Sequence, residues 1–181
     1  MNEVLEPRQG TVPIGVDLSG NWLIQTDERS DRRRIRQAIR RTDGNDDLDL
    51  VRRPNRDSAD RNRQSSRSGV TGGLAFVFLE IGSFLKVTQT EYGLFISFDR
   101  AVVEEYRFGE NRIINVGEAE AQRVTGWEGS QLVIETLDKN RMKMTERLSL
   151  IESGAVLERT ITFRSREGIV ETVVQRFDRQ D

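Results

Sequence analysis

The chain has 181 residues, 35% of them hydrophobic and 32% charged, with a formal net charge of −2. This length suffices for one domain with its own core. The sequence contains neither Cys nor His, which excludes disulfides, thiolate nucleophiles, Cys-type zinc sites and Ser-His-Asp catalysis. We therefore expect a protein that is not an enzyme, and the sequence predicts no cofactor and no metal site.

The chain begins with a polar lead, residues 1–16, which contains two Pro and two Gly residues and is expected to be a flexible arm. The lead lacks the basic and then apolar form of a signal peptide, and the longest apolar run, residues 74–79, is too short to cross a membrane. We expect a single domain over residues 17–181. It would be cytoplasmic unless a signal peptide has been removed.

A first strand is expected over residues 21–26, where β-favouring residues follow the turn chemistry of residues 17–20. Residues 28–73 then read as an insertion rich in Arg and Asp. Residues 28–72 hold 13 of the 28 basic residues, all of them Arg, against 8 of the 30 acidic residues. Such asymmetry indicates an interaction arm attached to an acidic body.

Within this insertion, Ser30 and Asp31 can cap a short basic helix over residues 32–41. Its apolar stripe is only three residues wide, Ile35, Ala38 and Ile39, and its flanks are nearly all Arg, so we expect no deep role for it in the core. The polar segment that follows, residues 42–72, has the composition of a disordered region, and the whole insertion is predicted to be mobile. The Arg cluster could grip phosphates, but neighbouring Asp residues can neutralise it, and no aromatic residues interleave. Nucleic acid is therefore an unlikely partner.

Residues 74–83 are apolar on nearly every side, and periodicity alone does not distinguish a buried strand from a buried helix. Gly82 and Ser83 stand before the next clear strand and favour a short helix that ends there. This segment could gate the mouth of a barrel. It could equally fill the barrel as a plug, and we favour the plug.

From Leu85 onward, alternating strands and tight turns recur at intervals of 8 to 12 residues, and the stretch from Gly126 to Phe163 contains three of these strands. Short consecutive turns favour an antiparallel up-and-down meander, which usually closes to remove exposed edges. The sequence therefore predicts an all-β barrel of about eight to ten strands, with a flexible basic insertion and a short helix between strands one and two. We also expect cross-strand ion pairs on the outer face from Glu135, Glu146 and Glu158 beside Arg147 and Arg159.

Two motifs carry a resemblance. Strand one contains Gly20-Asn21-Trp22, and the late strands contain Trp127-Glu128-Gly129 before Leu132-Val133-Ile134-Glu135-Thr136, then Arg147-Leu148, with Arg176 and Arg179 near the end. This pattern resembles a group of bacterial lipocalin-like (calycin-type) β-barrel proteins, and the long connection over residues 27–83 resembles a proteobacterial subgroup with an Arg-rich insertion. The resemblance implies a barrel whose base is closed by Trp22, with Arg176 or Arg179 packed across it. It also implies export to the cell envelope or periplasm, and the group offers no activity to transfer.

The leading function is non-catalytic binding of a small apolar or amphipathic ligand inside the barrel, because a barrel of this size can hold one small molecule. The alternative is a structural or interaction module of the cell envelope, with a filled barrel and a basic insertion that contacts a partner or an anionic surface. Ligand identity and oligomeric state are not fixed by the sequence. The candidates for the barrel interior are Trp22, Phe76, Phe84, Leu94, Ile96, Phe98, Leu132, Ile134, Leu148 and Phe163.

Overall fold

A computed structural model describes residues 3–43 and 77–181 of the chain. The described part contains ten strands, one α-helix and one short 3-10 helix. In chain order they are β1 (Gly20–Ile24), α1 (Glu28–Asp43), β2 (Phe84–Gln89), β3 (Gly93–Phe98), β4 (Val102–Arg107), β5 (Asn111–Val116), β6 (Ala119–Glu128), β7 (Gln131–Asp138), β8 (Lys143–Ile151), η2 (Glu152–Gly154), β9 (Val156–Arg164) and β10 (Val170–Gln180).

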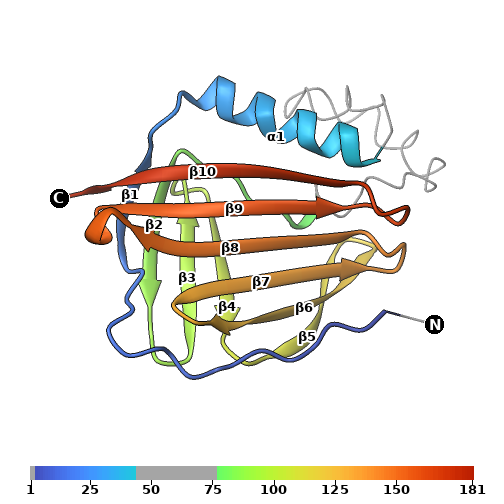
Figure 1. Ribbon diagram of the computed structural model, residues 1–181, viewed down its shortest axis with the longest axis horizontal. Coiled ribbons are helices and arrows are strands. Elements are labelled where there is room, and N and C mark those ends of the chain that lie inside the picture. The colour runs from blue at the N-terminus through green and yellow to red at the C-terminus, as the bar shows by residue number, and fades with distance from the viewer. Residues whose placement is uncertain (1–2, 44–76) are drawn as a thin grey trace.

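All ten strands form one antiparallel sheet with the order β4-β3-β2-β1-β10-β9-β8-β7-β6-β5. The sheet curls on itself, so that β2, β3 and β4 face the long strands β6 to β9 across the interior (Figure 1). Strand β1 lies between β2 and the C-terminal strand β10, because Trp22 pairs with Leu85 on one side and with Arg179 on the other. The predicted all-β, up-and-down, lipocalin-like barrel is confirmed.

The two edges of the sheet are β4 and β5, which follow one another in the chain. The chain changes partners between them: the Phe108 amide donates to the Tyr92 carbonyl on β3's side, and the Gly109 amide donates to the Thr125 carbonyl of β6. Gly109 has a φ of +76° and lies against Gly10, where an added Cβ would stand 3.0 Å from the Gly10 Cα. The wall is therefore not closed by a hydrogen-bonded ladder between β4 and β5, unlike the complete closure that the strand pattern suggested.

Helix α1 packs across β10 and β9, against side chains that these strands direct into the barrel (Figure 1). Asp27 caps its first turn by accepting from the Ser30 amide at 2.9 Å, one turn before the predicted cap. Its short apolar stripe is fully used, since Ile35, Ala38 and Ile39 are all buried against the strands. The expectation that this helix has no deep role in the core is therefore wrong. The mobility of the insertion stays a prediction, and its residues 44–73 lie outside the described residues.

The N-terminal segment, which we expected to be a flexible arm, contacts the barrel through several of its described residues. The Trp127 amide donates to the Gln9 carbonyl at 2.8 Å, which adds an isolated bridge to the outer side of β6. Leu5 is buried in a small cluster with Val124 and Leu137. Arg8 reaches Glu135 at 2.6 Å, and this partner is only 7% exposed. The polar composition of the segment concealed these contacts, because Leu5 is the only fully buried side chain among its described residues, while Val12 and Val16 are partly buried against the core.

The N-terminal segment crosses directly over Gly126, so this position leaves no room for a side chain. A Cβ added there would lie 2.5 Å from the Arg8 Cβ and 2.7 Å from the Gln9 carbonyl oxygen. We expect Gly126→Ala to lift this segment off β6 and to accelerate hydrogen exchange of the Trp127 amide, which loses its acceptor. A chain that begins at residue 11 is the matched control, because the same substitution should then have little effect. Unchanged exchange in the full chain would contradict this account.

Residues 77–83 lead from the insertion into β2. Val77 and Phe78 are helical and residues 79–83 are not, so the described part of the predicted 74–83 helix is two residues long. Phe78 and Leu79 are buried among side chains of α1, β8 and β9, with Val77 and Ile81 packed beside them. The segment therefore fills space at the end of the barrel covered by α1.

The core consists of two main apolar clusters. The first lies at the base of the barrel, around Trp22, and includes Leu18, Leu85, Val87, Leu94, Ile96, Phe98, Tyr106, Trp127, Leu132, Ile134, Leu148, Leu157 and Phe177. The second lies under α1 and includes Ile35, Ala38, Ile39, Phe78, Leu79, Ala121, Met142, Met144, Ile161, Phe163 and Val173. The side chains that separate these clusters are polar, and they define the site.

Candidate functional site

Polar side chains point into the barrel at one level of several neighbouring strands. On β9, Arg159 stands between the inward-facing residues Leu157 and Ile161, and on β8, Glu146 stands between Met144 and Leu148. Because alternate strand residues share a face, both charges must lie inside. The same level includes Arg123 of β6, Thr136 of β7 and Gln175 of β10, all buried.

Arg159 is the most completely bonded of these groups. Its side chain is 2% exposed and forms an ion pair with Glu146, which is 3% exposed. Its Nη1 donates to Gln175 Oε1 at 3.1 Å, and its Nη2 donates to the Glu80 carbonyl at 2.9 Å. The guanidinium also lies over the Phe98 ring, 5.4 Å from its centroid. Arg159 therefore ties the residue 77–83 segment to the wall of the barrel.

Gln175 extends this network to the helix. Its Nε2 donates to Asp31 Oδ2 at 2.7 Å, and Asp31 also pairs with Arg34 at 3.1 Å. Asp31 is 2% exposed even though it belongs to the first turn of a surface helix. A continuous series of hydrogen bonds thus runs from α1 to the Glu146 carboxylate inside the barrel.

The predicted outer ion pairs are divided between the two faces. Glu146 and Arg159 are inside, which corrects the expectation that they lie on the outer face. Glu158 is outside and pairs with Arg176 at 3.0 Å. Glu135 is on the outer side but is covered, and it accepts from Arg8 and Lys143. Burial acts to raise the pKa of Glu135, but the hydrogen bonds from Lys143 and Arg8 prevail and hold that pKa below its usual value.

Arg123 is equally buried but much less firmly held. Its side chain is 5% exposed, and its Nε donates to Thr136 Oγ1 at 3.2 Å. Its Nη2 donates to the Phe78 carbonyl at 3.4 Å, and its Nη1 lies 3.9 Å from Glu104 Oε2. The guanidinium lies 5.4 Å from the centroid of the Tyr106 ring. Its polar contacts with described residues are all 3.2 Å or longer, which leaves the guanidinium able to donate to a closer partner.

Four ionisable groups, Tyr106, Glu146, Glu80 and Glu104, lie near the two arginines. Burial raises the pKa of Tyr106 far above its usual range, and the negative charge of Glu146 adds to the effect, so the phenol stays protonated. Burial also raises the pKa of Glu80, with Glu104 contributing. The interior is thus a compact set of opposed charges between apolar layers. The described residues contain no group of three or more Asp or Glu side chains arranged to hold a metal ion.

Most predicted interior residues lie in the core, and they fall into both clusters. Phe163 lies in the cluster under α1. Phe84 was misplaced, because Leu85 and Val87 face inward and Phe84 therefore faces outward, where Arg100 lies over its ring at 5.7 Å. Phe76 lies outside the described residues. The remaining candidates are buried in the basal cluster: Trp22, Leu94, Ile96, Phe98, Leu132, Ile134 and Leu148.

The base of the barrel is built around Trp22, which is 0% exposed. Its Nε1 donates to the Leu18 carbonyl at 3.2 Å, and the Arg179 guanidinium lies 4.2 Å from its ring centroid. Arg179 also donates to the carbonyls of Ser19 and Gly154. Of the two arginines considered from the sequence, Arg179 occupies the position across Trp22, whereas Arg176 pairs with Glu158 on the outer face.

The sequence analysis did not identify Arg123, Glu146 and Gln175 as residues of the barrel interior. Such residues can be recognised where a polar side chain interrupts the apolar face of a strand, as Arg159 does between Leu157 and Ile161. Gln175 does the same between Val173 and Phe177. A charged residue on the inner face of a barrel strand needs a partner on a neighbouring strand, and Glu146 is that partner.

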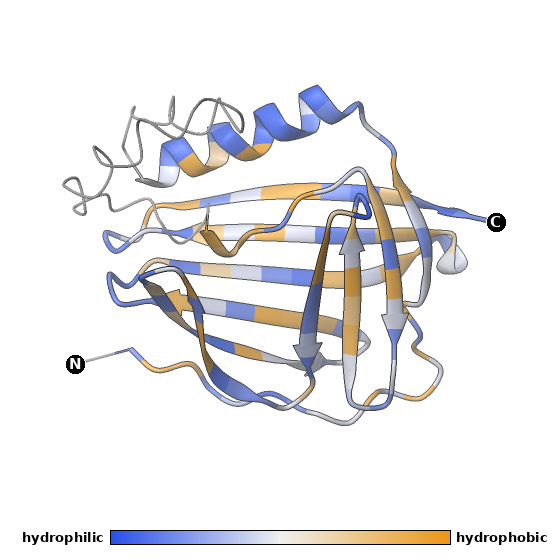
Figure 2. Ribbon diagram, turned by 180° about the vertical axis from the view of Figure 1, so that it is seen from behind, coloured by the Kyte–Doolittle hydropathy of each residue, from blue (hydrophilic) through white to orange (hydrophobic). Residues whose placement is uncertain are grey.

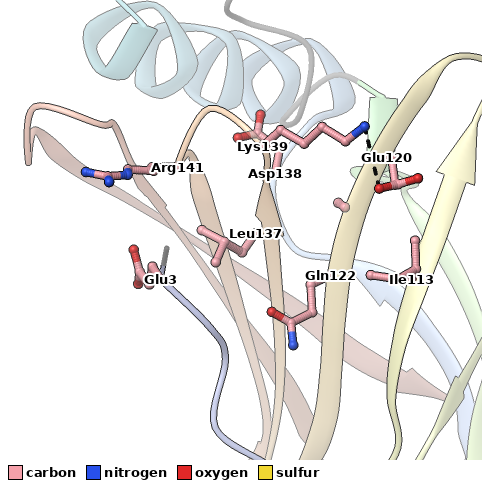
Figure 3. Close-up of a pocket in the computed structure, with 9 residues that line it drawn as sticks. Glu3, Ile113, Glu120, Gln122, Leu137, Asp138, Lys139 and Arg141 are labelled. Atoms are coloured by element: carbon pink, nitrogen blue, oxygen red, sulfur yellow. Dashed lines mark ion pairs between the residues drawn. The ribbon is translucent and has the colours of Figure 1, made fainter. Parts of the chain in front are cut away.

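A separate pocket of about 280 Å³ lies on the outside, between β5, β6 and the end of β7 (Figure 3). Ile113 and Leu137 form its apolar part, and Lys139 pairs with Glu120 at 3.6 Å at its rim. Its charged side chains are of both signs and do not converge on one point (Figure 3). The inner polar level is the stronger candidate, because its charged groups are buried and mutually oriented.

No family model and no curated protein match the sequence. Among solved structures, the chain is similar to a luciferase domain from the dinoflagellate Lingulodinium polyedrum, with a TM-score of 0.51, 10% identity and coverage of 96% of this chain. The chain spans 45% of the length of that structure.

The chain is also similar to secretory abundant heat soluble protein 4 from Ramazzottius varieornatus, with a TM-score of 0.51 and 13% identity. This match covers 92% of the present chain and 97% of the other. At such low identity, the similarity concerns the fold alone. The chain therefore has the antiparallel fold of the lipocalin-like barrels.

Proposed function

We propose that the protein binds a small amphipathic anion inside the barrel, without catalysis. The observation that carries this proposal is Arg123, a buried guanidinium that has no polar contact shorter than 3.2 Å with the described residues. A carboxylate or similar oxyanion would give it the short, charge-assisted pair that Glu104 does not. Tyr106, which is held protonated, lies against the same guanidinium.

The apolar part of the ligand would lie in the cluster under α1. Met142 and Met144 contribute flexible side chains there, and such side chains adapt to an inserted group. Phe78 and Leu79 occupy this region, and the Phe78 carbonyl is held by Arg123 through a 3.4 Å contact. A ligand would displace this weak contact and move the residue 77–83 segment aside. The entering group would replace both the carbonyl and the apolar side chains.

The proposal is tested by titrating the protein with dodecanoate and with dodecanol, followed by tryptophan fluorescence and calorimetry. We expect the carboxylate to bind at least tenfold more tightly, because a hydrogen bond to a charged group contributes about 1.5–3 kcal/mol. Arg123→Met should remove this preference while leaving the alcohol's affinity nearly unchanged. Arg147→Met, which alters a half-exposed outer guanidinium, is the matched control and should retain the preference.

A second candidate is an interaction module with a filled barrel. It is favoured by the burial of Phe78 and Leu79 and by the Arg159 bond to the Glu80 carbonyl, which together fix the segment as core. In that case neither probe binds, and Arg123→Met changes stability alone. Detectable binding of both probes with equal affinity would support an apolar ligand in place of an anion.

A further inference from the structure

Helix α1 presents a row of guanidinium groups to solvent. Arg29, Arg33, Arg36 and Arg40 are spaced by four, three and four residues, so they lie along one side of the helix over roughly 16 Å. The opposite side is buried against the barrel, which fixes the direction of this row. Figure 2 shows the polar colouring on the outward side of the helix and the apolar colouring toward the strands.

The row lacks counter-charges among the described residues. Arg32 pairs with Glu28 and Arg34 with Asp31, but no described carboxylate forms an ion pair with the four residues of the row. They line a shallow hollow of about 340 Å³, completed by Arg32 and Gln37. Like charges three and four residues apart repel one another. An anionic partner would relieve this repulsion.

Aliphatic side chains are exposed close to one end of this helix. Ile169 is 46% exposed and Val170 is 54% exposed, at the turn between β9 and β10. Figures 1 and 2 both place this turn at the same end of the molecule as the C-terminal end of α1. A basic helix beside exposed aliphatic groups is the combination that binds at the interface of a membrane.

We propose that α1 and the β9–β10 turn bind the surface of an anionic lipid bilayer. The row contains no aromatic side chain on which a base could stack. The exposed aliphatic side chains of the turn would also find no apolar partner on a nucleic acid backbone. The chain outside residues 28–72 has 15 basic against 22 acidic residues. An anionic bilayer would repel that acidic body and attract the helix, so the protein would bind with α1 against the headgroups.

The test is sedimentation of the full chain with vesicles of phosphatidylcholine, with and without phosphatidylglycerol. We expect binding to the mixed vesicles alone, weakened by added salt. The variant R29Q/R33Q/R36Q/R40Q should bind at least about 100-fold more weakly, because each Arg near the surface contributes about fivefold. Gln keeps the helix intact. The control R100Q/R107Q/K139Q/R176Q removes the same charge from exposed sites elsewhere and should bind nearly as the parent does.

A second variant, I169S/V170S, tests the turn. We expect it to lose most of the binding that remains at high salt, where the charges are screened. Equal binding by the parent and the α1 variant would overturn the proposal. It would also be overturned by equal binding to neutral vesicles, or by binding to a duplex DNA fragment without binding to either vesicle, which would assign the row to nucleic acid. These outcomes are independent of whether the barrel takes a ligand.

Discussion

Replacing Arg159 by Met is expected to lower the free energy of unfolding by about 3–5 kcal/mol, because the change leaves Glu146 charged and buried without its partner. Gln175 and the Glu80 carbonyl would lose their donor as well. Urea unfolding at neutral pH, followed by circular dichroism, measures the change. The effect should appear in the midpoint with little change in slope.

Two comparisons sharpen this prediction. The double variant E146L/R159M should recover much of the lost stability, because an apolar pair of similar volume often replaces a buried ion pair without cost. Arg176→Met removes an arginine from the exposed pair with Glu158 on neighbouring strands and should cost at most about 1 kcal/mol. Equal costs for Arg159→Met and Arg176→Met would show that the inner network does not stabilise the fold.

Trp22→Ala is expected to cost about 3–5 kcal/mol or to prevent folding, because Trp22 is fully buried at the base. The substitution leaves a cavity, orphans the Leu18 carbonyl and removes the ring beneath Arg179. Trp22→Phe keeps an aromatic ring and should cost much less. Thermal unfolding measures both variants.

The contact between Trp22 and Arg179 can be isolated by a double-mutant cycle. Trp22→Leu and Arg179→Ala, alone and combined, should show a coupling of about 0.5–1 kcal/mol, which is the range for exposed cation–π pairs. Arg176→Ala combined with Trp22→Leu is the control, since Arg176 contacts Glu158 instead, and its coupling should be near zero. Additive costs for Trp22 and Arg179 would show that their stacking adds nothing beyond burial.

The strands could be predicted because most of them alternate and end at a recognisable turn. Residues 143–151 and 156–164 show this plainly. The helix could be located from the spacing of its apolar residues. Its contribution to the core could not be predicted, because the burial of three apolar side chains depends on what they pack against. Ile35, Ala38 and Ile39 meet Phe163 and Val173, which lie more than 100 positions away in the sequence.

The site was harder to predict for a related reason. Arg159 and Glu146 face each other only once the β8–β9 register is known, in which Leu148 pairs with Arg159 and Glu146 with Ile161. The outer ion-pair expectation was wrong because it took both charges as outward-facing, although alternation with apolar neighbours on each strand places them inside. The looseness of the Arg123 contacts is a matter of tenths of an ångström and has no signature in the sequence.

The separation of β4 from β5 has a mechanical consequence. Every other junction in the wall is a hydrogen-bonded ladder, so moving those strands apart would break several bonds at once. Among the described residues, β4 is joined to β5 and β6 by side-chain contacts, from Arg112 of β5 to the Glu105 carbonyl at 2.8 Å and from Arg123 of β6 to Glu104 at 3.9 Å. The two strands meet at residues 108–110, where Gly109 allows the backbone to bend. Widening this seam would therefore break fewer hydrogen bonds than separating any pair of neighbouring strands in the sheet, and Arg123 lies beside it.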